Sequence, residues 1–288
     1  MPELPEVETV RRGLSALIIG KNIASEQHDT PKGFPNTPAD VASFMIGATI
    51  TDVRRRAKVL LVDLSTDYTL VIHLKMTGQL VFRGEQVFGA GHPNESLIGE
   101  LPDRSTRVTL AFTDGSHLYF NDQRKFGWMR LMPTLEVPNI NFMQKVGPEP
   151  LEADFTAEQF AARFTRRAKT SIKAALLDQT VVAGVGNIYA DESLWGAKIH
   201  PKRLVATITK DEFALLYTEL RAVMNLAIEK GGSTDKNYVN AEGKRGSYMD
   251  FARVFRREGQ TCPRCGTEII KFKAAGRGTH ICPVCQVQ

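Results

Sequence analysis

The chain has 288 residues, 42% of them apolar, and a formal net charge of +5. This length predicts two domains, with room for a small third module. No apolar run approaches the length of a membrane span, so we expect no membrane partner. The N-terminus lacks the basic region and apolar run of a signal peptide, which predicts a cytoplasmic protein.

The charge is unevenly distributed along the chain. Residues 1–150 carry 16 Lys and Arg against 17 Asp and Glu, whereas residues 151–288 carry 21 against 15. A basic C-terminal half suggests a polyanionic partner. Taken alone, however, an excess of this size fits an ordinary solvated surface better.

The first ten residues, MPELPEVETV, allow two interpretations. Pro5 suits the first turn of a helix, and an apolar stripe predicts that this helix covers residues 5–19. In the second interpretation Met1 is removed, and Pro2 becomes an N-terminal secondary amine followed directly by the acid Glu3. The stretch by itself favours the first interpretation.

Short alternating apolar runs follow, and they predict a β-sandwich or barrel. We expect a long exposed loop over 84–103, a linker around 133–150 and a mobile loop over 232–250. Thr209 and Glu212 form the capping-box signature of a long helix. The predicted strands are 48–53, 58–64, 69–76, 107–112 and 116–122, and the predicted helices are about 156–167, 171–179, 188–197 and 210–230.

The strongest local motif is CPRC at 262–265 followed, after sixteen residues, by CPVC at 282–285. Two such pairs are typical of a structural zinc site, because four thiolates fill the tetrahedral coordination sphere and leave no position for water. The residues between the pairs predict two strands joined at Gly276-Arg277-Gly278. Arg277 is either an ordinary turn residue or a ligand contact, and the flanking glycines favour contact. The predicted ligands are Cys262, Cys265, Cys282 and Cys285.

Three further stretches carry weaker signals. VAGVGNIY (182–189) places a glycine-rich turn before a helix, which suits a phosphate, although Asn187 could simply be the N-cap. RRRAK (54–58) puts basic residues ending in Lys58 at the start of a strand. NDQRKFGW (121–128) places Arg124 and Phe126 in a turn, where a cation beside an aromatic ring suits nucleic acid. Each of the last two also fits an ordinary charged surface, and Met76 in HLKMTG fits a core position.

Together these stretches resemble the formamidopyrimidine-DNA glycosylase family, nearly from end to end. The resemblance rests on PELPEVET, RRRAK, HLKMTG, RKFG, GVGNIY, the GGST and EGKRGSY stretches, and GRGTHICPVCQ. It implies an α+β fold with an N-terminal β-sandwich with a leading helix (1–135), a helix-two-turns-helix domain (136–250) and a C-terminal zinc ribbon (251–288). It also implies damaged double-stranded DNA held in a cleft between the halves, one structural Zn²⁺, a monomer and no nucleotide cofactor.

The resemblance also implies roles for single residues. Pro2 would be the nucleophile, Glu3 the acid and Lys58 an amine that assists elimination, while Arg277 would promote strand cleavage. The implied DNA-binding residues are Met76, Arg124, Phe126, Lys169 and Asn187. The implied activity is excision of 8-oxoguanine and formamidopyrimidines through a Schiff base at Pro2, followed by β,δ-elimination.

Three other functions compete with this interpretation. The related endonuclease VIII type removes oxidised pyrimidines with the same residues, but PELPEVET and GRGTH favour the purine-specific type. A non-catalytic zinc-ribbon DNA-binding protein would not need Pro2, Glu3 and Lys58. A metal-dependent nuclease would need a cluster of Asp, Glu and His with catalytic spacing, and none is apparent in the sequence.

Overall fold

The computed structural model describes residues 1–92, 94–233 and 247–287. The chain divides into two compact units. The first comprises Met1–Gln144 with the described part of Lys230–Ser247, and the second comprises Lys145–Glu229 with the described part of Tyr248–Gln288. Most of the loop predicted over 232–250 lies outside the described residues.

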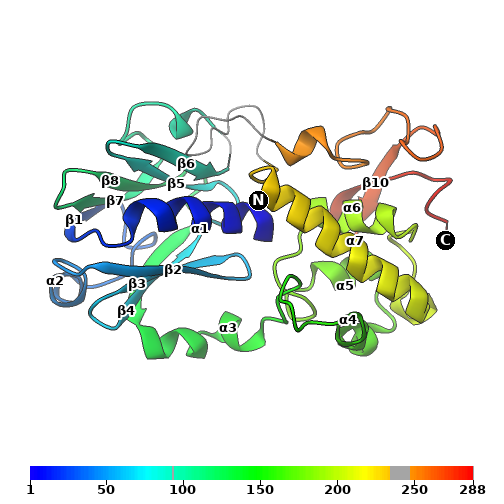
Figure 1. Cartoon of the computed structure of the whole chain (residues 1–288), viewed down its shortest axis with the longest axis horizontal. Coiled ribbons are helices and arrows are strands. Elements are labelled where there is room, and N and C mark those ends of the chain that lie inside the picture. Colours follow the sequence, from blue (N-terminus) through cyan, green and yellow to red (C-terminus); the bar gives the residue numbers. More distant parts are fainter. Residues whose placement is uncertain (93, 234–246, 288) are drawn as a thin grey trace. The chain divides into compact units, whose positions relative to one another are not determined.

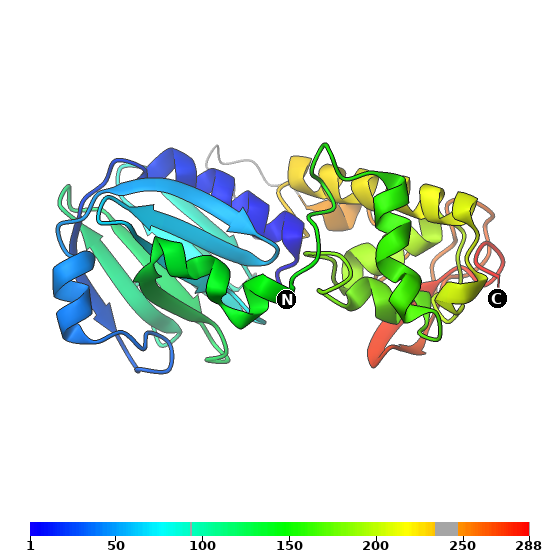
Figure 2. The ribbon, with the colours of Figure 1, turned by 90° about the horizontal axis from the view of Figure 1, so that it is seen from below.

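The first unit is a β-sandwich built from two antiparallel sheets (Figures 1 and 2). One sheet has the strand order β1-β7-β8-β5-β6, and the other has the order β2-β3-β4-β9. The strands are β1 (Ile23–His28), β2 (Ile50–Arg56), β3 (Val59–Leu64), β4 (Tyr68–His73), β5 (Gly78–Arg83), β6 (Val87–Gly91), β7 (Thr106–Phe112), β8 (His117–Asp122) and β9 (Trp128–Pro133).

Helix α1 (Leu4–Ile18) packs against strands of both sheets, as its apolar stripe predicts. Val7, Val10 and Leu14 are fully buried in a core that the two sheets share with the helix. A Cβ atom at Gly13 would lie 2.2 Å from the ring of Phe88, so glycine at this position lets β6 approach α1. A short helix, α2 (Pro38–Phe44), lies beside β1.

Two parts of the sandwich correct the sequence-based expectations. The segment 84–103 is not simply an exposed loop, because it contains β6 and the 3₁₀ helix η1 (Glu95–Leu97). Gly89 and Gly91 follow Phe88 and hide the alternation that marks a strand. The segment 133–150 is also not a plain linker, since it forms η2 (Thr134–Asn139) and α3 (Asn141–Lys145). Phe142 and Met143 pack there against the outer face of β3 and β4.

The second unit is helical and ends in a β-hairpin, in agreement with the predicted fold class. Its helices are α4 (Ala157–Phe164), α5 (Ile172–Leu177), α6 (Asn187–Gly196) and α7 (Lys210–Glu229), with 3₁₀ helices η3 (Thr165–Arg167), η4 (Val205–Thr207) and η5 (Tyr248–Asp250). Thr209 and Glu212 form the predicted capping box, since each side chain accepts the other's backbone N–H. The hairpin consists of β10 (Ile270–Ala274) and β11 (Arg277–Ile281).

Candidate active site and zinc centre

The N-terminal residues Pro2 and Glu3 are buried at the start of α1. Glu3 occupies the N-cap position, and its backbone N–H donates to Glu6 Oε2 over 2.8 Å. The other oxygen of the Glu6 carboxylate accepts the backbone N–H of Ser233, also over 2.8 Å. Glu6 therefore links the N-terminus to Ser233, which follows α7 in the chain.

Lys58 lies in a turn, which corrects its predicted place at the start of a strand. Arg56 pairs with Val59, so Ala57 and Lys58 form a two-residue hairpin turn between β2 and β3. Ala57 has φ = 52°, the left-handed conformation that such turns require. The Lys58 side chain is only 6% exposed.

Glu8 and Arg55 connect the Lys58 turn to α1. Arg55 Nη1 donates to the carbonyl oxygen of Ala57 over 3.1 Å, and its Nε donates to Glu8 Oε2 over the same distance. Burial raises the pKa of Glu8, but hydrogen bonds from Arg11 and Arg12 and the charge of Arg55 outweigh it and lower the pKa overall. The ionised Glu8 thus fixes the hairpin that carries Lys58 beside the helix that begins after Glu3.

Two turns at the ends of strands carry Met76, Arg124 and Phe126. Met76 is half-buried in the turn between β4 and β5, whereas Arg124 and Phe126 are exposed in the turn between β8 and β9. The Arg124 guanidinium lies 4.8 Å from the centre of the Phe126 ring, a cation–π contact. The second turn follows its prediction.

One carboxylate joins these two turns. Asp122 is fully buried and accepts the backbone N–H groups of Arg124, Phe126 and Gly127 over 2.6–3.2 Å. It also accepts the hydroxyl of Thr77, the residue after Met76. The sequence analysis missed this residue, although its position in NDQRKFGW, just before a turn, was a usable signal.

His73, at the end of β4, is held neutral. Burial, together with the positive charges of Lys75 and Lys58, lowers the pKa of His73 to about 3. Its Nδ1 accepts the backbone N–H of Lys75 over 3.0 Å, a bond that requires an unprotonated nitrogen. The ring therefore shapes the turn that leads to Met76 without adding charge.

In the second unit, Asn187 is the first residue of α6, and Gly186 is the N-cap. The alternative that made Asn187 the N-cap is therefore wrong. Its Nδ2 instead donates to the carbonyl oxygen of Gly278 over 2.9 Å, so the side chain reaches β11. Gln179 holds the preceding turn, because its amide accepts from Gly184 N–H and donates to the Val185 carbonyl.

Arg277 is exposed and begins β11, directly after the two-residue turn Ala275-Gly276. The hairpin tip is therefore one residue earlier than predicted. Lys169 is also exposed, between η3 and α5. The buried Lys173 donates to Asp191 Oδ1 over 2.5 Å and to Thr279 Oγ1, in the same strand as Arg277, over 2.7 Å. This buried pair joins α5, α6 and β11.

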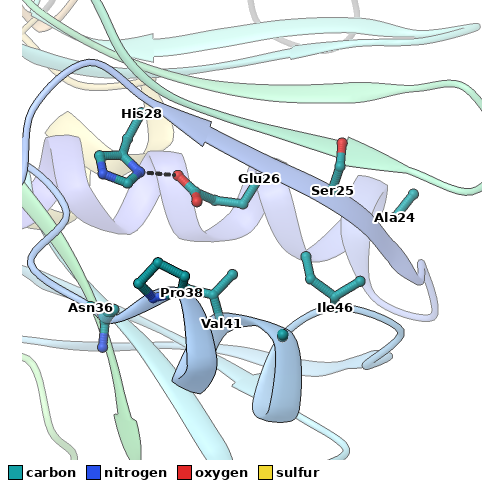
Figure 3. A pocket seen from close by; sticks show the side chains of 9 residues that line it. Ala24, Ser25, Glu26, His28, Asn36, Pro38, Val41 and Ile46 are labelled. Atoms are coloured by element: carbon teal, nitrogen blue, oxygen red, sulfur yellow. Dashed lines mark hydrogen bonds and ion pairs between the residues drawn. The ribbon is translucent and has the colours of Figure 1, made fainter.

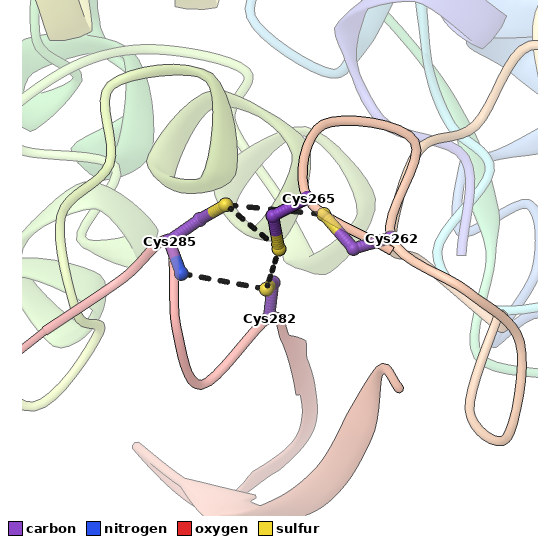
Figure 4. Close-up of side chains that lie close together, drawn as sticks. All are labelled: Cys262, Cys265, Cys282 and Cys285. Atoms are coloured by element: carbon purple, nitrogen blue, oxygen red, sulfur yellow. Dashed lines mark hydrogen bonds between the residues drawn. The ribbon is translucent and has the colours of Figure 1, made fainter. Parts of the chain in front are cut away.

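The four cysteines bring their sulfur atoms together, all within 4.8 Å of one another (Figure 4). Cys262 and Cys282 are buried, while Cys265 is exposed. Four sulfur donors at this spacing fit a tetrahedral ion, and a site of four cysteine thiolates suits zinc. The four side chains fill every coordination position, so the metal is structural.

A separate pocket of about 320 Å³ lies between β1 and α2 (Figure 3). Val41, Pro38 and Ile46 line its apolar side, and on the other side His28 Nδ1 lies 2.9 Å from Glu26 Oε1. None of the proposed catalytic or DNA-binding residues lines it.

No helix in the described part of the chain is long and apolar enough to span a membrane.

Three family models match the chain: the formamidopyrimidine-DNA glycosylase N-terminal domain at residues 1–129, the H2TH domain of that enzyme at 146–238, and the zinc finger found in FPG and IleRS at 259–287. The chain belongs to the formamidopyrimidine-DNA glycosylase family, whose members act in DNA repair.

Relatives in other organisms match over their full length. The formamidopyrimidine-DNA glycosylase of Herpetosiphon aurantiacus is 44% identical over 288 residues, covering 99% of this chain and 100% of its own. That of Pelotomaculum thermopropionicum is 41% identical over 294 residues, covering 99% of both chains.

Among solved structures, a mutant of Lactococcus lactis FPG in complex with DNA containing Fapy-dG superposes with a TM-score of 0.87 at 36% identity, covering all of both chains. The wild-type Lactococcus lactis enzyme with DNA containing N7-benzyl-Fapy-dG superposes with a TM-score of 0.86, also at 36% identity and full coverage.

Proposed function

We propose that this DNA glycosylase is bifunctional. It removes oxidised purines, 8-oxoguanine and formamidopyrimidines, from double-stranded DNA through a covalent intermediate on Pro2, and then cuts the strand at the abasic site. The observation that carries the proposal is the N-terminal arrangement: Pro2 comes directly before Glu3, the buried N-cap of α1, and the Glu8–Arg55 contact ties the Lys58 turn to the same helix.

The chemistry requires that Met1 be removed, because only then is the Pro2 nitrogen an amine. A terminal α-amine has a pKa of about 8, against about 10.4 for lysine, so a larger fraction is unprotonated at neutral pH. The amine is secondary, and the intermediate that it forms is therefore an iminium with a fixed positive charge. Lysine would reach the same state only after a further protonation.

In the first step, the nitrogen attacks C1′ of the damaged nucleotide, and the glycosidic bond breaks. The base leaves with the bonding electron pair and takes up a proton. The C1′–O4′ bond then opens to give the iminium, and O4′ takes a proton as well. Glu3, next to the amine in the chain, is the proposed donor.

In the second step, the iminium accepts electrons from the neighbouring C–H bonds. Loss of the C2′ proton expels the 3′ phosphate by β-elimination, and loss of the C4′ proton then expels the 5′ phosphate by δ-elimination. Water finally hydrolyses the adduct and releases the amine. Lys58 would grip the phosphate and assist proton removal, while Arg277 would neutralise the departing phosphate.

The remaining proposed residues would hold the DNA. Met76, Arg124 and Phe126 would fill the space that the flipped nucleotide leaves, and thereby offset an unstacking cost of a few kcal/mol. Asn187 Nδ2 has two protons, and one donates to Gly278, so the other can donate to a phosphate oxygen. Lys169 is exposed and can contact the backbone.

The lesion range has a second candidate. The solved structures include the wild-type Lactococcus lactis enzyme in complex with DNA containing an oxidised pyrimidine. Excision should therefore be compared on matched duplexes that carry 8-oxoguanine or thymine glycol. We infer preference for the purine, because the sequence resembles the purine-specific enzymes.

We also infer a monomer that uses no nucleotide cofactor and is organised as the three regions 1–135, 136–250 and 251–288. The support is that one chain supplies every proposed catalytic and DNA-contacting side chain. Sedimentation of the free protein and of its DNA complex tests the stoichiometry; a complex with two protein chains would contradict it.

The decisive experiment is borohydride trapping on DNA containing 8-oxoguanine. Reduction of the iminium should lock the enzyme to DNA, and mass analysis should place the adduct on the N-terminal peptide at Pro2. A variant that retains Met1 should not be trapped, because its Pro2 nitrogen is a tertiary amide. Glu3→Gln should still bind damaged DNA but lose most base excision.

Lys58→Ala is the matched control, since Lys58 is the other proposed amine in the site. It should still be trapped, with slower strand cleavage. An adduct that maps to Lys58, or one that persists when Pro2 is blocked, would overturn the N-terminal mechanism.

A further inference from the structure

The C-terminal end of α6 lies against the first cysteine pair of the ribbon. The indole Nε1–H of Trp195 donates to Cys262 Sγ over 3.4 Å, within the range of an N–H···S hydrogen bond. Trp195 is only 6% exposed, and it packs in one apolar cluster with Val254, Ile269 and Cys282. The tryptophan therefore belongs to the core of the ribbon, although it comes from the helix.

Arg264, which lies between Cys262 and Cys265, fixes the orientation of this indole. Its guanidinium stacks 4.0 Å from the centre of the Trp195 ring. The same group donates to the carbonyl oxygens of Trp195 and Gly196 over 3.0 and 3.1 Å. These carbonyls end α6, where a cation is favoured by the helix dipole. Arg264 thus caps the helix and holds the ring whose N–H meets the sulfur.

We propose that Trp195 is a positioning residue for the zinc site, which it stabilises through its N–H···S hydrogen bond to the Cys262 thiolate. A site of four thiolates and one Zn²⁺ would have a net charge of −2. A hydrogen-bond donor that withdraws part of the negative charge from a sulfur would therefore stabilise the metal-loaded site. A donor outside the coordination sphere also fixes the direction of the ligand. The backbone N–H of Cys285 gives similar support to Cys282 Sγ, but from within the ribbon. Trp195 adds a donor from a different element.

Helix α6 contacts the ribbon along its whole length. At the other end of the helix Asn187 contacts Gly278, and between the two ends Asp191 Oδ2 accepts the backbone N–H of His280 over 3.0 Å. The helix therefore meets the ribbon at its start, its middle and its end. Trp195 marks the point at which this contact reaches a metal ligand.

The test is the metal affinity of Trp195→Phe, which keeps an aromatic ring but lacks the N–H. The purified zinc-loaded protein is mixed with an excess of a chromogenic chelator, and zinc transfer is followed by absorbance. Loss of a donor outside the coordination sphere should weaken zinc binding about 10–100-fold. The matched control is Trp128→Phe, because Trp128, in β9, is the only other tryptophan in the sequence. Zinc binding of the wild-type strength in Trp195→Phe would overturn the proposal.

A spectroscopic readout separates the hydrogen bond from simple packing. In the Co²⁺-substituted protein, loss of the N–H should shift the thiolate-to-cobalt charge-transfer bands to lower energy, because the sulfur becomes a better electron donor. The Trp128→Phe control should leave the bands unmoved. If Trp195→Phe does not fold, the wild-type protein can be loaded with ¹¹³Cd and studied by NMR. The Trp195 indole proton should then show scalar coupling to the metal through the Cys262 sulfur. Absence of both the band shift and the coupling would refute the proposal.

Discussion

The two units hold their proposed functional residues by different means. In the sandwich, Lys58, Met76 and Arg124 lie in turns at the ends of strands, above an apolar core that both sheets and α1 share. Single carboxylates fix these turns: Glu8 acts through Arg55, and Asp122 binds two turns at once. In the helical unit, Asn187 and Arg277 depend on the contact between α6 and a ribbon whose two strands have few apolar residues.

This difference indicates which single change should disrupt each unit. The ribbon strands are short and half of their residues are exposed, so the ribbon depends on four metal ligands and on a buried ion pair. The sandwich has a large apolar core instead, but the Lys58 turn depends on Glu8, and the Met76 and Arg124 turns depend on Asp122. Metal removal should therefore affect one unit only, whereas loss of a single carboxylate should displace a turn and leave the sandwich folded.

The largest expected effect comes from Cys265→Ser, which removes one zinc ligand. Structural zinc contributes an apparent binding free energy of about 10–16 kcal/mol in small zinc modules, so the ribbon should lose its structure. Zinc content, DNA affinity and amide hydrogen exchange measure the result. We expect rapid exchange in residues 259–287, unchanged protection in the sandwich and a sharp loss of DNA binding. A metal-free variant that binds DNA as tightly as the wild type would contradict this division.

Lys173→Met should have the next largest effect. It leaves Asp191 buried without its cation, and breaking a buried ion pair in this way costs about 3–5 kcal/mol. Urea unfolding of the Trp128→Phe background, in which Trp195 is the remaining tryptophan, measures the loss by fluorescence. Lys21→Met is the matched control, since the Lys21–Asp114 pair lies at the surface, where solvent screens the interaction, and should contribute little. Equal losses of unfolding free energy in the two variants would show that the buried ion pair stabilises the protein no more than the surface pair does.

Local patterns in the sequence predicted much of this architecture. The cysteine spacing is confirmed by the cluster of four sulfurs, and the capping box at Thr209 by its reciprocal hydrogen bonds. Each pattern lies within a few residues, so the type and spacing of the side chains suffice. The catalytic and DNA-binding roles of single residues stay predictions.

The features that the sequence did not reveal depend on distant partners. Asp122 binds the hydroxyl of Thr77, 45 positions away, and Arg55 meets Glu8, 47 positions away. No local pattern encodes which carboxylate will meet which turn. Strand β6 was missed because its glycines mask the alternation, and the Lys58 turn was missed because Ala57 takes a left-handed conformation without the usual glycine or asparagine.

Asp122→Asn tests the carboxylate on which both sandwich turns depend. An asparagine amide keeps one acceptor oxygen, but its NH₂ group faces backbone N–H groups and cannot accept their hydrogen bonds. This loss should cost about 2–3 kcal/mol of unfolding free energy. We expect excision of 8-oxoguanine to slow more than cleavage of a preformed abasic site, because the abasic nucleotide has no base to unstack. Asp114→Asn, at an exposed turn of the same sheet, is the control. Equal slowing of the two reactions by Asp122→Asn would contradict a role in placing Arg124 and Phe126.

The smallest expected effect is a pH dependence that arises from His73. Its pKa is lowered to about 3 in the folded protein, against 6.5 for the free side chain, so the unfolded chain binds more protons between these values. The free energy of unfolding should therefore fall as the pH drops below 6.5, by about 2 kcal/mol from this group between pH 7 and pH 5. Urea unfolding at the two pH values measures the loss. His73→Gln should lose less than the wild type over this interval, because glutamine does not titrate. If His73→Gln loses as much as the wild type, the buried neutral histidine is not the group that titrates, and acid sensitivity in the sandwich has to come from its carboxylates instead.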